Sequence, residues 1–218
     1  MLKLLIVIVL SYLAGSVPTS IIASKLFRGI DIRDYGSGNA GATNVLRVLG
    51  WRIALLVMVV DVGKGFVAAR FIAPLAFSAI PDHPALVQIL AGTAAVVGHI
   101  YTVFAGFRGG KGVGTGAGVM LALYPLATLI CAAVFFAVAF ATRYVSLASL
   151  TAVILLPALL ILFRQVFHWP VDAYLLVFAA LVAALIVFAH RSNIRRLMAG
   201  TENRFGSKRQ GTQEAAHE

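Results

Sequence analysis

The sequence predicts an all-α integral membrane protein, a bundle of seven transmembrane helices with its N-terminus outside and its C-terminus in the cytoplasm. Of the 218 residues, 61% are hydrophobic and 12% are charged, and the mean hydropathy is +0.94. Soluble domains have roughly 45–50% apolar and 25% charged residues, which excludes a soluble fold. The apolar residues form long stretches, and most basic residues lie between those stretches.

Five stretches are long enough to cross a bilayer, which requires about 17–25 mostly apolar residues. They lie near residues 3–24, 53–73, 85–104, 146–163 and 171–189. The first begins like a signal peptide, but its apolar character continues through Ile21 and Ile22, so we expect a retained helix. A further apolar region, 112–142, is long for one span and short for two, with Tyr124-Pro125 near its middle. The single cysteine, Cys131, lies in this region and indicates packing, not a disulfide framework.

The basic residues indicate how region 112–142 is placed. If it crosses twice, or dips in and returns, 14 of the 18 basic residues share one side. These are Lys25, Arg28, Arg33, Arg47, Arg52, Arg108, Lys111, Arg143, Arg191, Arg195, Arg196, Arg204, Lys208 and Arg209. A single crossing would put Arg143 and the basic tail outside, against the positive-inside bias. The net charge of +10 is therefore typical of membrane orientation, and we expect no nucleic-acid partner.

The loop before the second span is rich in small polar residues. Residues 37–44 read Ser-Gly-Asn-Ala-Gly-Ala-Thr-Asn, and Arg47 follows. Glycine lets a ligand approach the backbone, and hydroxyls, amides and free N–H groups hold oxyanions. A connector is the alternative, but Thr43-Asn44 before apolar residues and Arg47 indicates a helix N-terminus aimed at an anion. This loop predicts a phosphate site made of Ser37, Gly38, Asn39, Gly41, Thr43, Asn44 and Arg47.

A second glycine-rich loop covers residues 107–116. It resembles a Walker A loop, but that pattern needs Gly at position 105 and Ser or Thr at 112, where the chain has Ala105 and Gly112. An ATPase is therefore rejected. Successive N–H groups beside a lysine still form an anion nest, which predicts a second phosphate site at Arg108, Gly109, Gly110 and Lys111. The alternative is a tight turn whose cations only anchor the topology.

Two intramembrane sites carry ionisable groups. Asp61 and Lys64 lie three residues apart, on one face of the second span. Such groups usually face the bundle interior and pair, so a neutralising pair is favoured over a substrate contact or proton relay. His99, near the end of the third span, is either a hydrogen-bonded structural residue or a general base.

The segment that closes the last span also contains recognition groups. Residues 190–196 read His-Arg-Ser-Asn-Ile-Arg-Arg, and the Asn193 amide offers a donor and an acceptor that a membrane anchor does not need. Residues 200–206 are expected to be ordered. We expect residues 1–206 to form the transmembrane domain and residues 207–218 a disordered polar tail.

These segments together resemble the bacterial acyl-phosphate:glycerol-3-phosphate acyltransferase family. The resemblance covers most of the chain and is specific because many short motifs occur in the same order. They are Gly15–Thr19, Gly36–Asn44, Asp61–Gly65, Gly98-His99, Phe107–Val113, Arg143–Leu147, His190–Ile194 and Gly200–Asn203. The family often has Lys where this chain has Arg108, which keeps the charge.

The resemblance implies an enzyme that transfers a fatty acyl group from acyl phosphate to the sn-1 hydroxyl of glycerol 3-phosphate. The products are 1-acyl-glycerol 3-phosphate and phosphate, and neither acyl-CoA, acyl carrier protein, cofactor nor metal is required. The implied location is the bacterial plasma (inner) membrane, among membrane lipids, with the active site on the cytoplasmic side. Two phosphate-bearing substrates match two anion-holding loops.

The resemblance also implies site residues. Ser37, His190 and Asn193 are the expected catalytic residues, and Ser146 joins the loop residues in substrate binding. Other glycerol-phosphate acyltransferases have His followed by Asp five positions later, and no histidine here shows that spacing. The base is therefore His190, His99 or the phosphate of the donor itself.

Two other functions are weighed against this one. A transporter for a phosphorylated solute would explain intramembrane charges, but it needs polar groups toward both faces, and the outer loops are nearly featureless. A lipid-binding scaffold would explain basic clusters without explaining the Ser, Asn and Thr pattern.

Overall fold

The fold is that of a computed structural model, which describes residues 1–206. The predicted disordered tail, 207–218, lies outside the described residues. All regular elements within 1–206 are helical. In chain order the α-helices are α1 (Leu2–Ser16), α2 (Thr19–Arg28), α3 (Ala42–Leu49), α4 (Trp51–Val67), α5 (Pro84–Ile100), α6 (Val113–Leu123), α7 (Pro125–Thr142), α8 (Val145–Gln165), α9 (Ala173–Ala189) and α10 (Arg191–Met198). Short 3₁₀ segments η1 (Ile32–Asp34), η3 (Ala73–Ala79) and η4 (Val103–Ala105) and a π-helical segment, η2 (Ala68–Ile72), complete the set.

The first predicted span is interrupted. It is broken at Val17-Pro18 into α1 and α2, because proline pushes the preceding residue into extended backbone, here φ −54° and ψ 114°. The other long spans begin and end within a few residues of their predicted limits, except that α4 continues through η2 and η3 to Ala79.

Region 112–142 forms two helices that run in opposite directions, α6 and α7, joined at Tyr124. At about 1.5 Å per residue, the 11-residue α6 is roughly 16 Å long, about half of a bilayer core. The segment therefore doubles back, with a half-length helix as its first arm, and whether it crosses the membrane twice or dips in and returns stays a prediction.

Four helical segments among residues 1–206 are long and apolar enough to cross a membrane, or five if the bent pair α9–α10 counts as one span. The four are Leu2–Arg28, Pro84–Ala105, Pro125–Thr142 and Val145–Gln165. This result confirms an all-helical, multi-pass protein. The count of seven helices and their orientation stay predictions.

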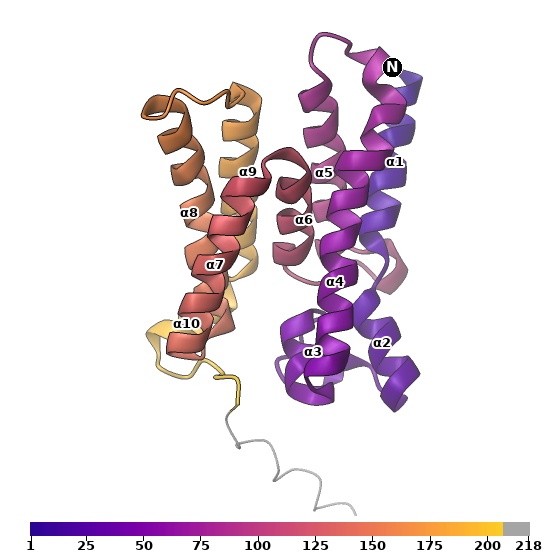
Figure 1. The fold of residues 1–218 in the computed structure, drawn as a ribbon. Coiled ribbons are helices and arrows are strands. Elements are labelled where there is room, and N and C mark those ends of the chain that lie inside the picture. Colours follow the sequence, from indigo (N-terminus) through magenta and orange to yellow (C-terminus); the bar gives the residue numbers. More distant parts are fainter. Residues whose placement is uncertain (207–218) are drawn as a thin grey trace, which may run out of the picture.

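Close helix contacts hold the bundle together. A Cβ at Gly65 of α4 would collide with the backbone of Thr115 in α6, and one at Gly118 of α6 with the backbone of Val62. Small residues let helices in lipid approach closely. Figure 1 shows α6 between two groups of helices, α7–α9 on one side and α1, α4 and α5 on the other.

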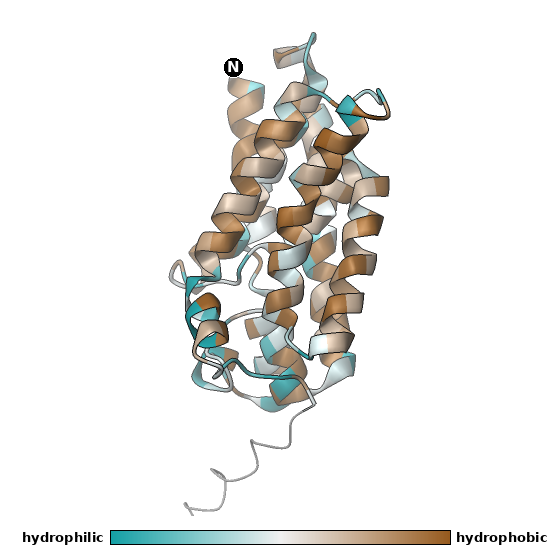
Figure 2. Cartoon of the chain, turned by 90° about the vertical axis from the view of Figure 1, so that its left-hand side faces the viewer, coloured by the Kyte–Doolittle hydropathy of each residue, from teal (hydrophilic) through white to brown (hydrophobic). Residues whose placement is uncertain are grey.

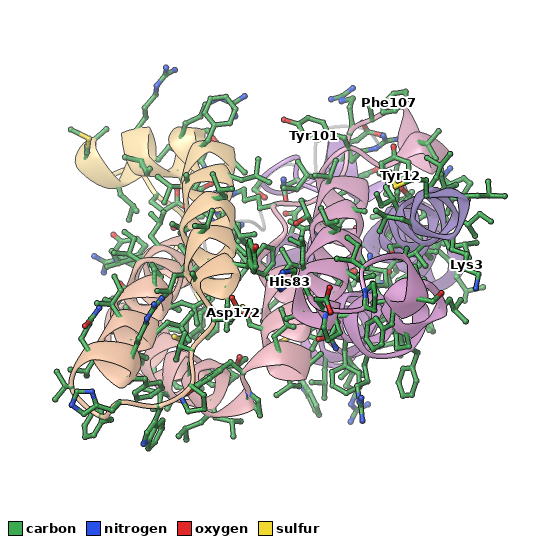
Figure 3. All side chains as sticks on the ribbon, turned by 90° about the horizontal axis from the view of Figure 1, so that it is seen from above. Lys3, Tyr12, His83, Tyr101, Phe107 and Asp172 are labelled. Carbon is green, nitrogen blue, oxygen red and sulfur yellow. The ribbon has the colours of Figure 1, made fainter. Side chains whose placement is uncertain are left out.

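The two ends of the bundle differ. The N-terminus and the 80–84 loop lie at one end, and α2, α3 and α10 lie at the other (Figure 1). Apolar residues dominate the middle of the helices and hydrophilic ones gather at the ends (Figure 2). Figure 3, viewed from the N-terminal end, shows Lys3 at the edge and His83 and Asp172 nearer the centre. Asp172 caps α9 by accepting from Tyr174 N at 3.0 Å, and the His83 and Tyr174 rings make an edge contact.

Candidate active site

The first glycine-rich loop is organised by Asn44. This side chain is 1% exposed, and its Oδ1 accepts from Ser37 N at 2.8 Å while its Nδ2 donates to Ile32 O and Tyr35 O at 3.0 and 2.9 Å. Gly38 has φ +69°, a left-handed conformation that side chains resist. All hydrogen-bonding groups of Asn44 thus hold the loop backbone, which leaves Ser37, Asn39 and Thr43 to face the cavity described below.

The second loop is fixed by the end of α5. Gly109 N donates to Ile100 O, and Gly110 N donates to His99 O, both at 3.0 Å. The loop is also tied to the first one, because Arg33 Nη1 donates to Ala105 O at 2.9 Å. Lys111 follows these turns and donates from Nζ to the Asn193 Oδ1.

The third part of the site lies where α9 ends and α10 begins. Asn193 Nδ2 donates to Glu202 Oε1 at 2.7 Å, Ser146 Oγ donates to the same oxygen at 3.0 Å, and Arg196 Nε donates to Oε2 at 2.7 Å. The Glu202 carboxylate therefore orients the Asn193 amide so that its oxygen faces Lys111. His190 is 3% exposed, and its Nδ1 lies 2.8 Å from Ile186 O. Since a carbonyl only accepts, Nδ1 carries the proton and Nε2 is left as an acceptor.

These parts line one cavity of about 410 Å³. Its polar lining comes from the two loops, α3, α4, the end of α5, the start of α8, the junction of α9 and α10, and the segment after α10. It includes Ser37, Asn39, Thr43, Arg47, Asp61, His99, Lys111, Ser146, His190, Asn193 and Glu202. Its apolar lining comes from α4, α6, α7, α8 and α9 and includes Met58, Leu121, Leu129, Phe135, Leu156 and Val182. The cavity suits a molecule with an anionic head and a long apolar chain.

Burial sets the charges of the polar groups. Burial, with smaller effects of Arg196 and Arg47, lowers the pKa of Lys111 to about 8. Burial and the nearby Lys111 charge lower the pKa of His190 to about 4, so this imidazole is neutral at pH 7. Burial alone would raise the pKa of Glu202, but hydrogen bonds from Asn193, Arg196 and Ser146 lower it overall.

Arg47 is the second cation of the site. Burial lowers the pKa of Arg47, but a guanidinium stays charged in proteins. Its Nε is buried without a hydrogen-bond partner, and its Nη2 donates to Asn203 O at 3.4 Å. An uncompensated buried donor at a cavity wall fits an anionic ligand.

Most predicted site residues line this cavity. They are Ser37, Asn39, Gly41, Thr43, Asn44, Arg47, Lys111, Ser146, His190 and Asn193. Gly110 lines a second, smaller cavity that shares Asn39 and Lys111 with the first. Gly38 and Gly109 lie in the loops without lining either cavity, and Arg108 is exposed, as a topology anchor would be. The functional roles of all these residues stay predictions.

Sequence reasoning missed Glu202 as a site residue. Its buried carboxylate joins α8, α10 and the segment after α10, held there by Phe205 N donating to Arg143 O at 3.0 Å. Two signals were available: its place in the Gly200–Asn203 motif, and its position as the only acidic residue between Asp172 and the final tail.

The comparisons with known proteins agree with this geometry. A family described as Glycerol-3-phosphate acyltransferase matches residues 5–200. The chain is 45% identical to the glycerol-3-phosphate acyltransferase of Chlorobium phaeobacteroides (strain BS1), over 94% of this chain and 97% of that relative. It is also 45% identical to the glycerol-3-phosphate acyltransferase of Chlorobaculum tepidum, over 95% of this chain and 100% of that relative.

Two crystal structures of PlsY, an integral membrane glycerol 3-phosphate acyltransferase, share the fold. The glycerol 3-phosphate form has a TM-score of 0.80 and 41% identity, covering 93% of this chain and 96% of that one. The lysophosphatidic acid form has a TM-score of 0.78 and 40% identity, covering 93% and 95%. With this match in sequence, length and fold, the chain belongs to the glycerol-3-phosphate acyltransferase family.

Proposed function

We propose that the chain transfers the fatty acyl group of acyl phosphate to the sn-1 hydroxyl of glycerol 3-phosphate at the cytoplasmic face of the bacterial plasma membrane. The observation that carries this proposal is the cavity. It joins a cationic, hydrogen-bonding end to an apolar end within one 410 Å³ space. Acyl phosphate has the same two-part character, with a phosphate head and an alkyl chain.

In this proposal the cations hold the phosphates. Lys111 and Arg47 enter from two different segments, and Ser37, Asn39 and Thr43 add neutral donors beside them. Such groups would align the hydroxyl of one substrate with the carbonyl of the other and hold the charge that develops on the leaving phosphate.

The reaction we propose is a direct transfer. The sn-1 oxygen bonds to the acyl carbon, the carbon–oxygen bond to phosphate breaks, and the hydroxyl proton goes to the departing phosphate. A pKa of about 4 makes His190 a weak base, so it does not take the proton. Its Nε2 instead accepts a hydrogen bond and so supports the attack. Acyl phosphate is a mixed anhydride and already activated, so no covalent enzyme intermediate is needed.

A purified-enzyme assay tests this function. The protein in detergent or lipid nanodiscs is given glycerol 3-phosphate with either acyl phosphate or acyl-CoA, and release of phosphate and formation of the lysophospholipid are followed. We expect equal amounts of both products with acyl phosphate and no turnover with acyl-CoA. Turnover with acyl-CoA alone would refute the proposed donor. A burst of phosphate release without glycerol 3-phosphate, equal to the amount of enzyme, would refute direct transfer.

A further inference from the structure

A buried ion pair lies in helix α4, and its Asp61 lines the proposed site cavity, as does His99 of α5. Lys64 Nζ lies 2.7 Å from Asp61 Oδ1, and both side chains are 7% exposed. The same ammonium donates to Val17 O at 3.0 Å and lies 3.2 Å from His99 Nδ1 on α5. Val17 O, where helix α1 has ended, also accepts from Thr19 N at 2.9 Å, so Lys64 is a second donor to this carbonyl. Lys64 therefore connects the break between α1 and α2 with α4 and α5.

The contacts of Lys64 fix the state of His99. An ammonium group has three protons and accepts none, so Nδ1 of the imidazole must be the acceptor in this pair. His99 is then neutral, with its proton on Nε2. The ring cannot turn freely, because Asp61 Oδ1 also lies 3.7 Å from Nδ1 and the side chain is 8% exposed.

The Nε2–Cε1 side of the His99 ring faces the second glycine-rich loop. A Cβ placed on Gly110 would collide with His99 Nε2 and lie 2.9 Å from its Cε1. The backbone of the same loop donates to His99 O, one residue before Lys111. The imidazole is thus packed directly against the backbone that carries the phosphate-binding lysine.

We propose that Asp61, Lys64 and His99 act as one positioning unit for the loop that presents Lys111. Lys64 and Asp61 hold the His99 ring in one orientation, and the ring sets where Gly110, and hence Lys111, sits in the cavity. A buried ion pair is seldom more stabilising than apolar packing, so geometry is a better account of these charges than stability. The inference rests on the proposed role of Lys111 in binding phosphate.

Steady-state kinetics of full-length variants test this unit. His99→Leu removes the acceptor for Lys64 and the polar edge toward Gly110. Lys111→Ala is expected to raise the KM of the substrate whose phosphate Lys111 holds. His99→Leu should raise the KM of that same substrate by about tenfold, with kcat changed by less than about threefold. His99→Asn, which keeps an acceptor on a short planar side chain, should restore most of the loss. Thr93→Val, elsewhere on α5, is the matched control and should leave KM unchanged.

Two further variants keep the test decisive if His99→Leu folds poorly. Asp61→Asn/Lys64→Met removes both charges together and should raise KM as His99→Leu does, with no further rise when the two are combined. Gly110→Ala should raise KM strongly in the wild type and much less in a His99→Ala background, where the ring is gone.

The outcomes separate this inference from the proposed function. If Lys111→Ala leaves both KM values unchanged, the proposed phosphate role of Lys111 is wrong. If Lys111→Ala raises KM but the Asp61, Lys64 and His99 variants only lower the melting temperature, the unit is structural packing and the inference is wrong. A large loss of kcat at unchanged KM would make His99 a catalytic residue and would also overturn positioning.

Discussion

Among single residues, Lys111 has a pKa that lies close to physiological pH. It is charged below its pKa, which burial lowers to about 8, so under the proposed function its attraction for phosphate is lost as pH rises through that value. A bound phosphate would raise the pKa again, because an opposite charge favours the ammonium form.

We therefore predict that kcat/KM of the wild-type enzyme falls above about pH 8. The corresponding alkaline limb of the pH profile of kcat should lie at higher pH. Lys111→Arg should abolish the limb in kcat/KM, since arginine stays protonated. Lys111→Ala should raise KM by roughly tenfold to a hundredfold, the loss of one charge-assisted hydrogen bond. Initial rates in overlapping buffers measure all three, and an unchanged limb in Lys111→Arg would contradict the assignment.

His190 gives the second residue-scale prediction. With a pKa of about 4, His190 stays neutral as pH falls from 7 to about 5, so any change of rate over that range should come from the substrate phosphates, whose second pKa is about 6. His190→Asn should raise the KM of glycerol 3-phosphate up to about tenfold by removing an acceptor, and leave the profile's shape unchanged. A thousandfold loss of kcat, about 4 kcal/mol of barrier, at unchanged KM would instead identify His190 as the base.

At the scale of elements, the segment after α10 closes the site through Glu202. The folded state lowers the pKa of this carboxyl, so its contribution to stability is present above the unfolded pKa and lost as pH falls through the folded one. Glu202→Gln should lower the free energy of unfolding by about 1–3 kcal/mol near pH 7, because it weakens bonds to Ser146, Asn193 and Arg196. The difference in the free energy of unfolding between this variant and the wild type should become smaller at acid pH. Thermal unfolding at several pH values checks this, and a difference that grows in acid would count against it.

Helix α7 provides a test of the apolar half of the cavity. Ala132 lines the cavity, whereas its neighbour Ala133 is exposed and does not. Ala132→Phe should shorten the preferred acyl chain, since each excluded methylene costs about 0.8 kcal/mol, or roughly fourfold in kcat/KM. Ala133→Phe should leave the preference unchanged. Competition between acyl phosphates of different length measures the shift in preference. Equal effects of both variants would show that the acyl chain binds elsewhere.

At the scale of the whole molecule, the predicted seven-helix arrangement implies which end faces the cytoplasm. A cysteine at Ser37 or Asn193 should react with a membrane-impermeant thiol reagent only from the cytoplasmic side, and one at Pro81 only from outside, in a Cys131→Ala background. The motivation is the basic residues that share one side. Labelling of positions 37 and 193 from opposite sides would overturn both the arrangement and the common site.

The sequence predicts much of this fold because the bilayer imposes simple rules. Long apolar runs and the distribution of cations locate the helices, and the Asp61–Lys64 pair, three residues apart, is confirmed at 2.7 Å. Contacts between distant segments carry no such periodic signal. Lys64 meets His99 across 35 positions, and Glu202 meets Ser146 across 56, so neither contact was predicted. Arg108 is exposed in the structure, and its predicted role in phosphate binding stays a prediction.

The contact between Lys111 and Asn193 has a consequence for selectivity. Because the ammonium already has an amide oxygen as partner, an incoming group must compete with that oxygen to reach it. A phosphate carries charge and forms the stronger bond, whereas the hydroxyls of an unphosphorylated polyol offer no more than the amide does. Under the proposed function, Asn193 would set a threshold that glycerol fails and glycerol 3-phosphate passes, and the free enzyme would discriminate between them before any acyl donor arrives.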